Sequence, residues 1–294
     1  MSISTTNMAE KVCLVTGTTQ GIGKSTALGL AKMGAKVVIV ARDRVRGEAA
    51  AEDIRKESGA ANDAVELLIA DLSSLESVRQ LAAEFKSKHT RLDVLVNNAG
   101  AINMTREVTV DGYEKTFATN HLAYFLLTDL LLDLLKTSAP SRIVNVASDA
   151  HKRSTIDFYD LQGERDYRGI VAYMQSKLAN ILYTYELAKR LEGTGVTANS
   201  LHPGVVATGF GHNNSGVLGF LVKIGAPFLI KPEKGAATSI YLASSPDVAK
   251  VSGKYFAKCK VTRSNRESND PVVRERLWKL TEELVKPKAA SAGT

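Results

Sequence analysis

The 294-residue sequence has few cysteines and few aromatic residues. Its two cysteines, Cys13 and Cys259, lack the spacing of a metal site and are too few for a disulfide framework. No run of about 20 apolar residues occurs, so we expect no membrane-spanning helix. Residues 1–10 also lack the apolar stretch of a signal peptide. Together these absences favour a reducing compartment, and we expect a cytoplasmic location.

The composition is otherwise that of an ordinary globular protein. Hydrophobic residues make up 44% of the chain and charged residues 23%, which excludes disordered and collagen-like classes. The net charge of +7 is concentrated between Lys254 and Lys288. A basic face there would attract nucleic acid or an anionic membrane, but interspersed acidic residues also fit a solvated helix face. We favour the solvated face, expect no nucleic-acid partner and leave peripheral membrane contact open.

Short apolar runs alternate with longer helical patterns, as in a doubly wound α/β protein. The strand-like runs are 11–16, 36–41, 65–70, 93–96, 142–147, 196–201 and 254–257, and the helical patterns are roughly 21–33, 46–58, 74–88, 111–136, 172–192, 233–244 and 271–285. The strand runs show little polar alternation, which is typical of strands buried on both faces of a parallel sheet. No linker divides the chain, so we predict one domain, 1–294, with helices on both faces of the sheet.

A glycine-rich turn follows the first strand and precedes a helix. In this turn Gly17 allows a tight bend, Gly21 lets the backbone approach a phosphate, and Gly23 lets helix and strand pack closely. Backbone N–H groups at the helix start would then face an anion. We therefore predict a dinucleotide-binding turn that includes Thr19, Gln20 and Ile22; the alternative is a plain structural turn.

Two further strand ends bear on the choice of cofactor. An acidic residue at the tip of the second strand would bind the ribose diol of NAD, but the tip is Ala41 and Arg42 follows it. A guanidinium there can bind a 2′-phosphate, which favours NADP(H) over NAD(H). The alternative is that Asp43 takes the diol. After the third strand, we predict that Asp71 and Leu72 border the adenine, although Asp71 also suits a helix cap.

The strongest chemical signal is Tyr173 followed four residues later by Lys177. On a helix these positions share a face. A phenol titrates near pH ~10, and a neighbouring ammonium favours the phenolate. Tyr173 would then exchange protons near neutral pH. In isolation, such a pair is more often an accidental surface pair, so its surroundings decide the interpretation.

Other polar residues are expected at the same edge of the sheet. Ser148 follows the fifth strand, where it would donate a hydrogen bond to a carbonyl oxygen, and Asn98 follows the fourth. Asn120 lies within a long helical pattern, where asparagine is unfavourable and a buried amide needs partners. We predict that Asn120 binds a water that relays protons to Lys177. A loop or capping role for Ser148 and an exposed or locally bonded amide at Asn120 are the alternatives.

These residues together resemble the short-chain dehydrogenase/reductase family. The motifs are TGTTQGIG (16–23), NNAG (97–100), Asn120, Ser148, YMQSK (173–177) and HPGVVAT (202–208), in the expected order over nearly the whole chain. The resemblance implies a Rossmann-type sheet of seven parallel strands in the order 3-2-1-4-5-6-7. It implies a catalytic tetrad of Asn120, Ser148, Tyr173 and Lys177. Around the cofactor it implies Gly17, Gly21, Gly23, Asn98, Ala99, Gly100, Pro203, Val206 and Thr208, with Tyr173 and Lys177.

Within that family the chain looks like the retinol dehydrogenase-like branch. The matching stretches include DLSSLESVR (71–79), TNHLAYFLLT (119–128) and SKLANILYTYELAKRLEGTGV (176–196). The branch implies an NADPH-dependent reductase of lipophilic aldehydes or ketones, with a retinoid as one candidate substrate. Other carbonyl classes (steroid, quinone, tetrapyrrole) and a non-catalytic NADP(H)-sensing protein remain open.

The apolar segment 205–232 is predicted to cover the substrate pocket, although it also fits a packed helix or a dimer contact. Family resemblance also implies a homo-oligomer formed through the helices near 111–136 and 172–192. His121 and His202 have no ligand cluster around them in the sequence, so we interpret both as structural.

Overall fold

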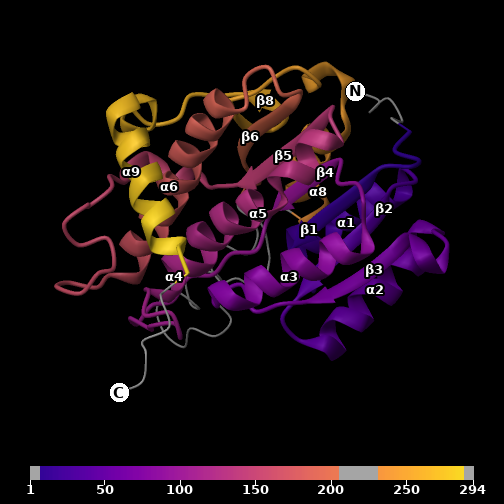
Figure 1. Cartoon of the computed structure of the whole chain (residues 1–294), viewed down its shortest axis with the longest axis horizontal. Helices are drawn as coiled ribbons and strands as arrows, with labels where there is room; N and C mark the ends of the chain where they lie inside the picture. Colours follow the sequence, from indigo (N-terminus) through magenta and orange to yellow (C-terminus); the bar gives the residue numbers. More distant parts are fainter. Residues whose placement is uncertain (1–6, 205–230, 288–294) are drawn as a thin grey trace.

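The structure of the protein is a computed structural model, which describes residues 7–204 and 231–287. Its centre is an eight-stranded sheet in the order β3-β2-β1-β4-β5-β6-β7-β8 (Figure 1). The strands are β1 Val12–Thr16, β2 Lys36–Ala41, β3 Val65–Ile69, β4 Val94–Asn97, β5 Ser141–Val146, β6 Val196–His202, β7 Tyr255–Ala257 and β8 Lys260–Val261. The first seven strands pair in parallel and β8 pairs antiparallel with β7. The predicted order is confirmed, and β8 adds a short strand that we did not predict.

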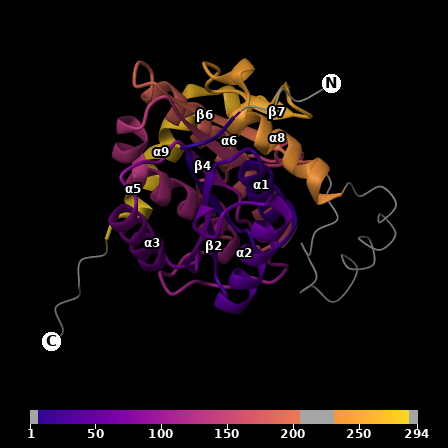
Figure 2. The same ribbon diagram turned by 90° about the vertical axis from the view of Figure 1, so that its right-hand side faces the viewer.

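Helices cover both faces of this sheet. They are α1 Gly21–Lys32, α2 Arg44–Ser58, α3 Leu75–Lys88, α4 Lys115–Phe117, α5 Ala123–Thr137, α6 Gly169–Arg190, α8 Pro232–Ser244 and α9 Pro271–Val285. Short 3₁₀ turns are η1 Asn62–Ala64, η3 Asp149–Arg153, η5 Pro246–Val248 and η6 Glu267–Asn269, and η2 Ala118–Leu122 is a π-turn. Figure 2 shows α1, α2 and α8 on one side of the sheet and α3, α5 and α9 on the other. In the part of the chain that is described, no helix combines the length and apolar character needed to cross a bilayer.

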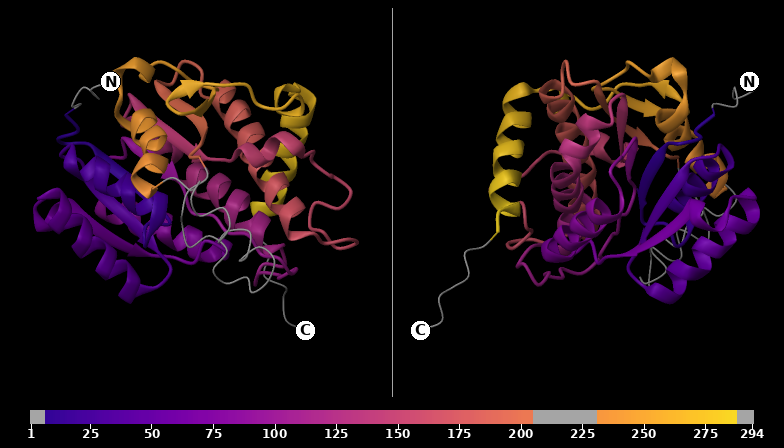
Figure 3. Two further views of the ribbon diagram at one scale, coloured as in Figure 1. Left: turned by 180° about the vertical axis from the view of Figure 1, so that it is seen from behind. Right: turned by 45° about the vertical axis from the view of Figure 1, so that its right-hand side comes forward.

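The two layers bury separate apolar cores, as the largely apolar strands predicted. Cys13 and Leu14 are neighbours in β1, yet Cys13 packs with Leu30 under α1 and Leu14 packs with Phe85 under α3. Both cysteines are free thiols. Helix α9 lies outside α6 rather than on the sheet (Figure 3). There Trp278 stacks on the ring of Tyr183, with 5.7 Å between their centroids.

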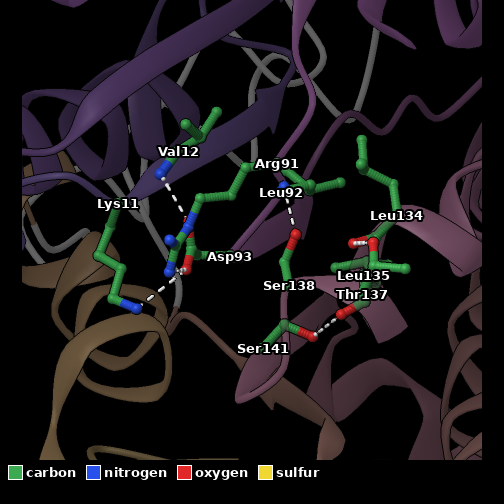
Figure 4. A network of polar contacts seen from close by, with 10 residues as sticks. All are labelled: Lys11, Val12, Arg91, Leu92, Asp93, Leu134, Leu135, Thr137, Ser138 and Ser141. Atoms are coloured by element: carbon green, nitrogen blue, oxygen red, sulfur yellow. Dashed lines mark hydrogen bonds and ion pairs between the residues drawn. The ribbon is translucent and has the colours of Figure 1, made fainter.

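The amino-terminal edge of the sheet is closed by a set of matched polar contacts (Figure 4). The Asp93 carboxylate, whose side chain is 2% exposed, accepts hydrogen bonds from Lys11 Nζ (2.9 Å), the Val12 N–H (3.0 Å) and Arg91 Nε (2.6 Å). Burial alone raises the pKa of Asp93, but the donors from Arg91, Val12 and Lys11 hold it below its usual value. The buried Asp93 carboxylate thus has matched partners, and we interpret this cluster as structural.

Candidate active site

The glycine turn after β1 is closed onto the end of β4. Thr16 Oγ1 accepts the N–H groups of Asn98 (2.9 Å) and Ala99 (3.0 Å), and Asn98 Nδ2 donates to the Thr16 carbonyl (2.8 Å). A Cβ at Gly23 would lie 2.2 Å from the Gly17 carbonyl oxygen, and one at Gly17 would lie 2.7 Å from Ala99 Cα. Only glycine fits at either position, because the facing atoms are backbone.

The start of α1 is suited to an anion. Gly21 has a φ of +62°, and Gln20, at the N-cap, makes no side-chain capping bond. No acidic residue occupies the first turn, so nothing there competes with or repels an anion. Thr19 and Ile22 lie half-buried beside the turn. The residues present therefore fit the pyrophosphate of a dinucleotide.

At the tip of β2, the guanidinium of Arg42 is available for a ligand, whereas the carboxylate of Asp43 caps a helix. Arg42 is exposed, while Asp43 caps α2 by accepting the Arg46 N–H at 2.8 Å. Arg46 Nη2 reaches back to Gln20 Oε1 at 3.4 Å, which brings a second cation beside the turn. Lys24 is paired with Asp53 at 2.5 Å. Arg42 and Arg46 thus supply cations on the β2 side of the turn, and Arg46 was not among the predicted residues.

The end of β3 is arranged around Asp71. Its Oδ1 accepts the N–H (2.9 Å) and the hydroxyl (2.7 Å) of Ser73. The cap of α3 is Ser74, which accepts the Ser77 N–H at 3.3 Å, so Asp71 is not the helix cap that we considered as its alternative role. Leu72 is buried next to it. The adenine contact predicted for Asp71 and Leu72 stays a prediction.

Ser148 and Tyr173 meet at the carboxyl edge of the sheet. Ser148 lies two residues after the end of β5 and is the N-cap of η3, where its hydroxyl accepts the Ala150 N–H at 3.2 Å. Tyr173 lies in the first turns of α6, and a side-chain hydrogen bond links it to Ser148. Burial raises the pKa of Tyr173, and the bond with Ser148 offsets only part of that rise.

Lys177 is buried one turn further along α6. Its side chain is 3% exposed, and Nζ lies 5.7 Å from the centre of the Tyr173 ring and donates to the Val146 carbonyl at 3.1 Å. Burial lowers the pKa of Lys177 to about 7. We predicted that the Lys177 ammonium lowers the pKa of Tyr173. In the structure the pKa of Tyr173 is raised instead, because burial disfavours the charged forms of both groups.

Asn120, in the π-turn η2, borders the same part of the site as Lys177. Its Oδ1 accepts the Ala101 N–H at 2.7 Å, and its Nδ2 donates to the Ala101 carbonyl and to Ser176 Oγ, both at 2.9 Å. A Cβ on Gly100 would lie 3.3 Å from Lys177 Nζ and 3.4 Å from Asn120 Oδ1, so both side chains border Gly100. Asn120 is therefore a buried, bonded amide, and not the exposed one that we considered. We predicted one regular helix over 111–136, and the π-turn interrupts it.

The remaining predicted residues lie at or beyond the end of β6. Pro203 follows β6 and is half-buried. Val206, Thr208 and almost all of the predicted lid, 205–232, lie outside the described residues. His202 Nδ1 accepts the Asp149 N–H at 3.3 Å, and His121 contacts Asn180 and Thr281. Both histidines thus have the structural partners that we expected.

Two residues that border the site were missed. Tyr124, on the first turn of α5, donates to the Ala99 carbonyl at 2.8 Å, and its ring centre lies 5.8 Å from Lys177 Nζ. His151 is buried behind Ser148. His151 lies only three residues after Ser148, but no motif of the sequence marks it, whereas Tyr124 lies four residues after Asn120, a spacing that places both on one side of a helix.

Comparison with known proteins agrees with this geometry. The family model "short chain dehydrogenase" matches residues 11–216. Retinol dehydrogenase 14 of Mus musculus is 46% identical over 289 residues, which cover 95% of this chain and 86% of the relative. Retinol dehydrogenase 13 of Homo sapiens is 46% identical over 288 residues, covering 96% of this chain and 86% of the relative.

Solved structures give the same picture. An uncharacterised protein from Mycobacterium paratuberculosis superposes with a TM-score of 0.78 and 33% identity, covering 96% of both chains. The RhlG/NADP active-site complex of Pseudomonas aeruginosa has a TM-score of 0.69 and 30% identity, covering 85% of this chain and 95% of its own.

Proposed function

The chain belongs to the short-chain dehydrogenase family, and from this premise we propose that it is an NADPH-dependent reductase of lipophilic aldehydes or ketones, reversible with the alcohol and NADP. The single observation that carries the proposal is the convergence of Ser148, Tyr173, Lys177 and Asn120 beside the glycine turn. A family oxidoreductase needs both a dinucleotide cradle and a proton donor at one sheet edge, and this edge offers both.

The cradle consists mainly of backbone. Gly17, Gly21 and Gly23 would hold the pyrophosphate, with Arg42 and Arg46 toward the 2′-phosphate and Lys177 toward the nicotinamide ribose. When bound, the cofactor supplies or accepts the hydride at the nicotinamide ring. Exposed Arg42 and the use of Asp43 as a helix cap support NADP(H) over NAD(H).

The side chains then stabilise the negative charge on the substrate oxygen and exchange a proton with it. The hydroxyls of Ser148 and Tyr173 donate hydrogen bonds to the carbonyl oxygen as negative charge grows on it. Tyr173 gives its proton to that oxygen in reduction and takes it back in oxidation. Lys177, with a pKa of about 7, is a source from which Tyr173 regains a proton. Asn120 holds the Ala101 backbone and Ser176 around them, and the water path through Asn120 remains a prediction.

A lipophilic substrate is supported by two observations. The relatives reported above are named retinol dehydrogenases. The segment 205–232 is unusually apolar in sequence, as the cover of an apolar pocket would be. A retinoid is therefore one candidate among lipophilic carbonyls.

The test is NADPH oxidation against retinal, medium-chain aldehydes, a steroid ketone and a quinone. Tyr173→Phe should lower kcat by about 10²–10⁴-fold, because it removes the proton donor, and should leave NADPH binding intact by fluorescence titration. Tyr183→Phe, farther along the same helix, is the matched control and should keep wild-type turnover. Full activity in Tyr173→Phe would refute the assignment. NADPH binding without oxidation across the panel would favour a sensing protein.

Cofactor preference is tested by the same assay with NADH in parallel. Arg42→Ala should raise KM for NADPH by about 10-fold, the worth of a charge-assisted bond to phosphate, and should leave KM for NADH unchanged. Arg44→Ala is the control, because Arg44 faces Glu48 on α2 at 3.7 Å. Equal use of NADH and NADPH by the wild type would show that Arg42 does not read a 2′-phosphate.

A further inference from the structure

The backbone of Ser148 is held by one residue, His151. The carbonyl of Ser148 accepts two hydrogen bonds from it, one from the His151 N–H at 3.1 Å and one from the ring Nδ1 at 2.7 Å. His151 is fully buried. The ring thus closes η3 on itself, directly behind the hydroxyl that meets Tyr173.

The other ring nitrogen anchors this turn to a distant segment. His151 Nε2 accepts the Asn265 N–H at 3.2 Å, and Asn265 Nδ2 donates to the carbonyls of His151 (3.1 Å) and Ser154 (2.9 Å). Tyr255 of β7 packs edge-on against the ring, with 4.9 Å between centroids. The position of Ser148 is therefore tied to the sheet and to the stretch before η6, 114 residues away in sequence.

The partners fix the protonation of the ring. A carbonyl only accepts, so Nδ1 carries a hydrogen; a backbone N–H only donates, so Nε2 carries none. His151 is then a neutral Nδ1–H tautomer, and burial lowers its pKa in the same direction. A neutral ring with both nitrogens engaged has no capacity left for acid–base work, so its contribution is geometric.

We propose that His151 is a positioning residue for Ser148: through its Nδ1–H bond to the Ser148 carbonyl and its anchor at Asn265, it keeps the Ser148 hydroxyl directed at the oxygen that Tyr173 protonates. This inference rests on the proposed function, which gives Ser148 its task. Misplacing an oriented group by about 1 Å lowers turnover by up to about 10²-fold. Since the His151 N–H still holds the Ser148 carbonyl when the ring is lost, we expect a loss of kcat of about 10-fold.

Two variants separate the hydrogen bond from the packing. His151→Phe keeps a ring against Tyr255 and loses both ring hydrogen bonds. His151→Asn loses the ring and keeps an amide N–H able to donate to the Ser148 carbonyl. If His151 positions Ser148, the His151→Asn variant should keep a higher kcat than the His151→Phe variant. The KM for NADPH should be unchanged in both. A role in packing alone predicts the reverse order, with activity following Tm, and that result would overturn the proposal.

Coupling to Ser148 is the sharper measurement. In a Ser148→Ala background, His151→Phe should add less than about 2-fold to the loss of kcat, because the group it positions is gone. An undiminished loss in that background would also overturn the proposal. His89→Phe is the matched control. His89 is another buried histidine, stacked on Phe85 far from the site, and its replacement should leave kcat unchanged.

A readout without turnover keeps this inference separate from the proposed function. In ¹⁵N-histidine-labelled protein at pH 7, the imidazole signal that disappears in His151→Phe should be that of a neutral Nδ1–H tautomer. A crystal structure of His151→Phe should show the Ser148 hydroxyl displaced from Tyr173. A charged or Nε2–H ring, or an unmoved Ser148, would refute the positioning role. If the wild type binds NADPH and reduces nothing in the panel, the proposed function fails and these two measurements still decide the inference.

Discussion

The two edges of the sheet have opposite effects on the charged form of a buried side chain. At the amino-terminal edge, the Asp93 carboxylate is surrounded by donors from Arg91, Val12 and Lys11, and its pKa is lowered. At the carboxyl edge, Lys177 is as deeply buried, yet it donates to the neutral carbonyl of Val146, and its pKa falls to about 7. The first edge favours the charged form of its buried group and the second disfavours it.

This difference distinguishes a structural polar cluster from a catalytic one. A buried charge with matched partners stabilises the fold, whereas a buried amine without a carboxylate destabilises it and is useful only when something binds there or a proton moves. The two edges should therefore respond oppositely to neutral substitutions: loss of stability with activity kept at Asp93, and loss of activity with stability gained at Lys177.

The largest effect is expected from Lys177→Met. Turnover should fall by about 10²–10⁴-fold, while Tm of the cofactor-free protein rises at pH 7, because a buried amine is replaced by an apolar chain of similar length. Below about pH 7 the folded protein must bury the charged amine, so the gain is greatest there. It shrinks as pH rises toward 10.5, the usual value of lysine.

Thermal unfolding across pH and steady-state kinetics check this prediction. Lys189→Met, at an exposed position of the same helix, is the control and should change neither quantity. A Lys177→Met protein that is less stable than the wild type at pH 7 would show that the amine is matched after all, and the contrast between the edges would disappear.

Asp93→Asn should have the opposite outcome. It weakens charge-assisted bonds to three donors, so we expect a loss of about 2–3 kcal/mol in the free energy of unfolding with kcat unchanged at 25 °C. Because the folded-state pKa of Asp93 is lowered, the wild-type advantage is present above pH 3.8 and disappears as pH falls through the lower folded value. Denaturant unfolding measures it. Asp53→Asn, which changes an exposed ion pair, should have no measurable effect.

Gly23→Ala tests the backbone part of the carboxyl edge. Its Cβ would meet the Gly17 carbonyl, which cannot move without opening the turn, so we expect NADPH affinity to fall by about 10- to 100-fold. Gly29→Ala lies on the same helix, where the Cβ would meet only the movable tip of Ile240. Fluorescence titration should show wild-type affinity for Gly29→Ala. Equal affinities for the two variants would mean that the close approach at Gly23 does not shape the cofactor turn.

What the sequence predicted depends on short-range patterns. Most of the seven parallel strands are rich in apolar residues, and the glycine turn and the Tyr173–Lys177 pair lie within one or two turns of chain. The strand order then places Ser148 and Asn98 at the carboxyl edge of the sheet, because the carboxyl ends of parallel strands lie together. Each of these features can be found from neighbours in the sequence.

The features that escaped prediction depend on distant or unusual neighbours. The clamp from His151 to Asn265 links residues far apart in the chain. The turn into β8 has Lys258 (φ +51°) and Cys259 (φ +59°) in a left-handed conformation that normally favours glycine or asparagine, so no hairpin signal is visible in the sequence. The altered proton affinities of Tyr173 and Lys177 arise from burial, which a helical spacing does not reveal.

The π-turn at Ala118–Leu122 ties chemistry to chain length. A π-turn holds one residue more than the same stretch of regular helix, so removing one residue there would restore a regular helix and leave the rest of α5 in register. Leu127, Leu131 and Leu135 would keep their buried positions, whereas Asn120 would lose its present surroundings. The length of the chain at this turn therefore sets the position of the amide beside Lys177 without setting the packing of α5.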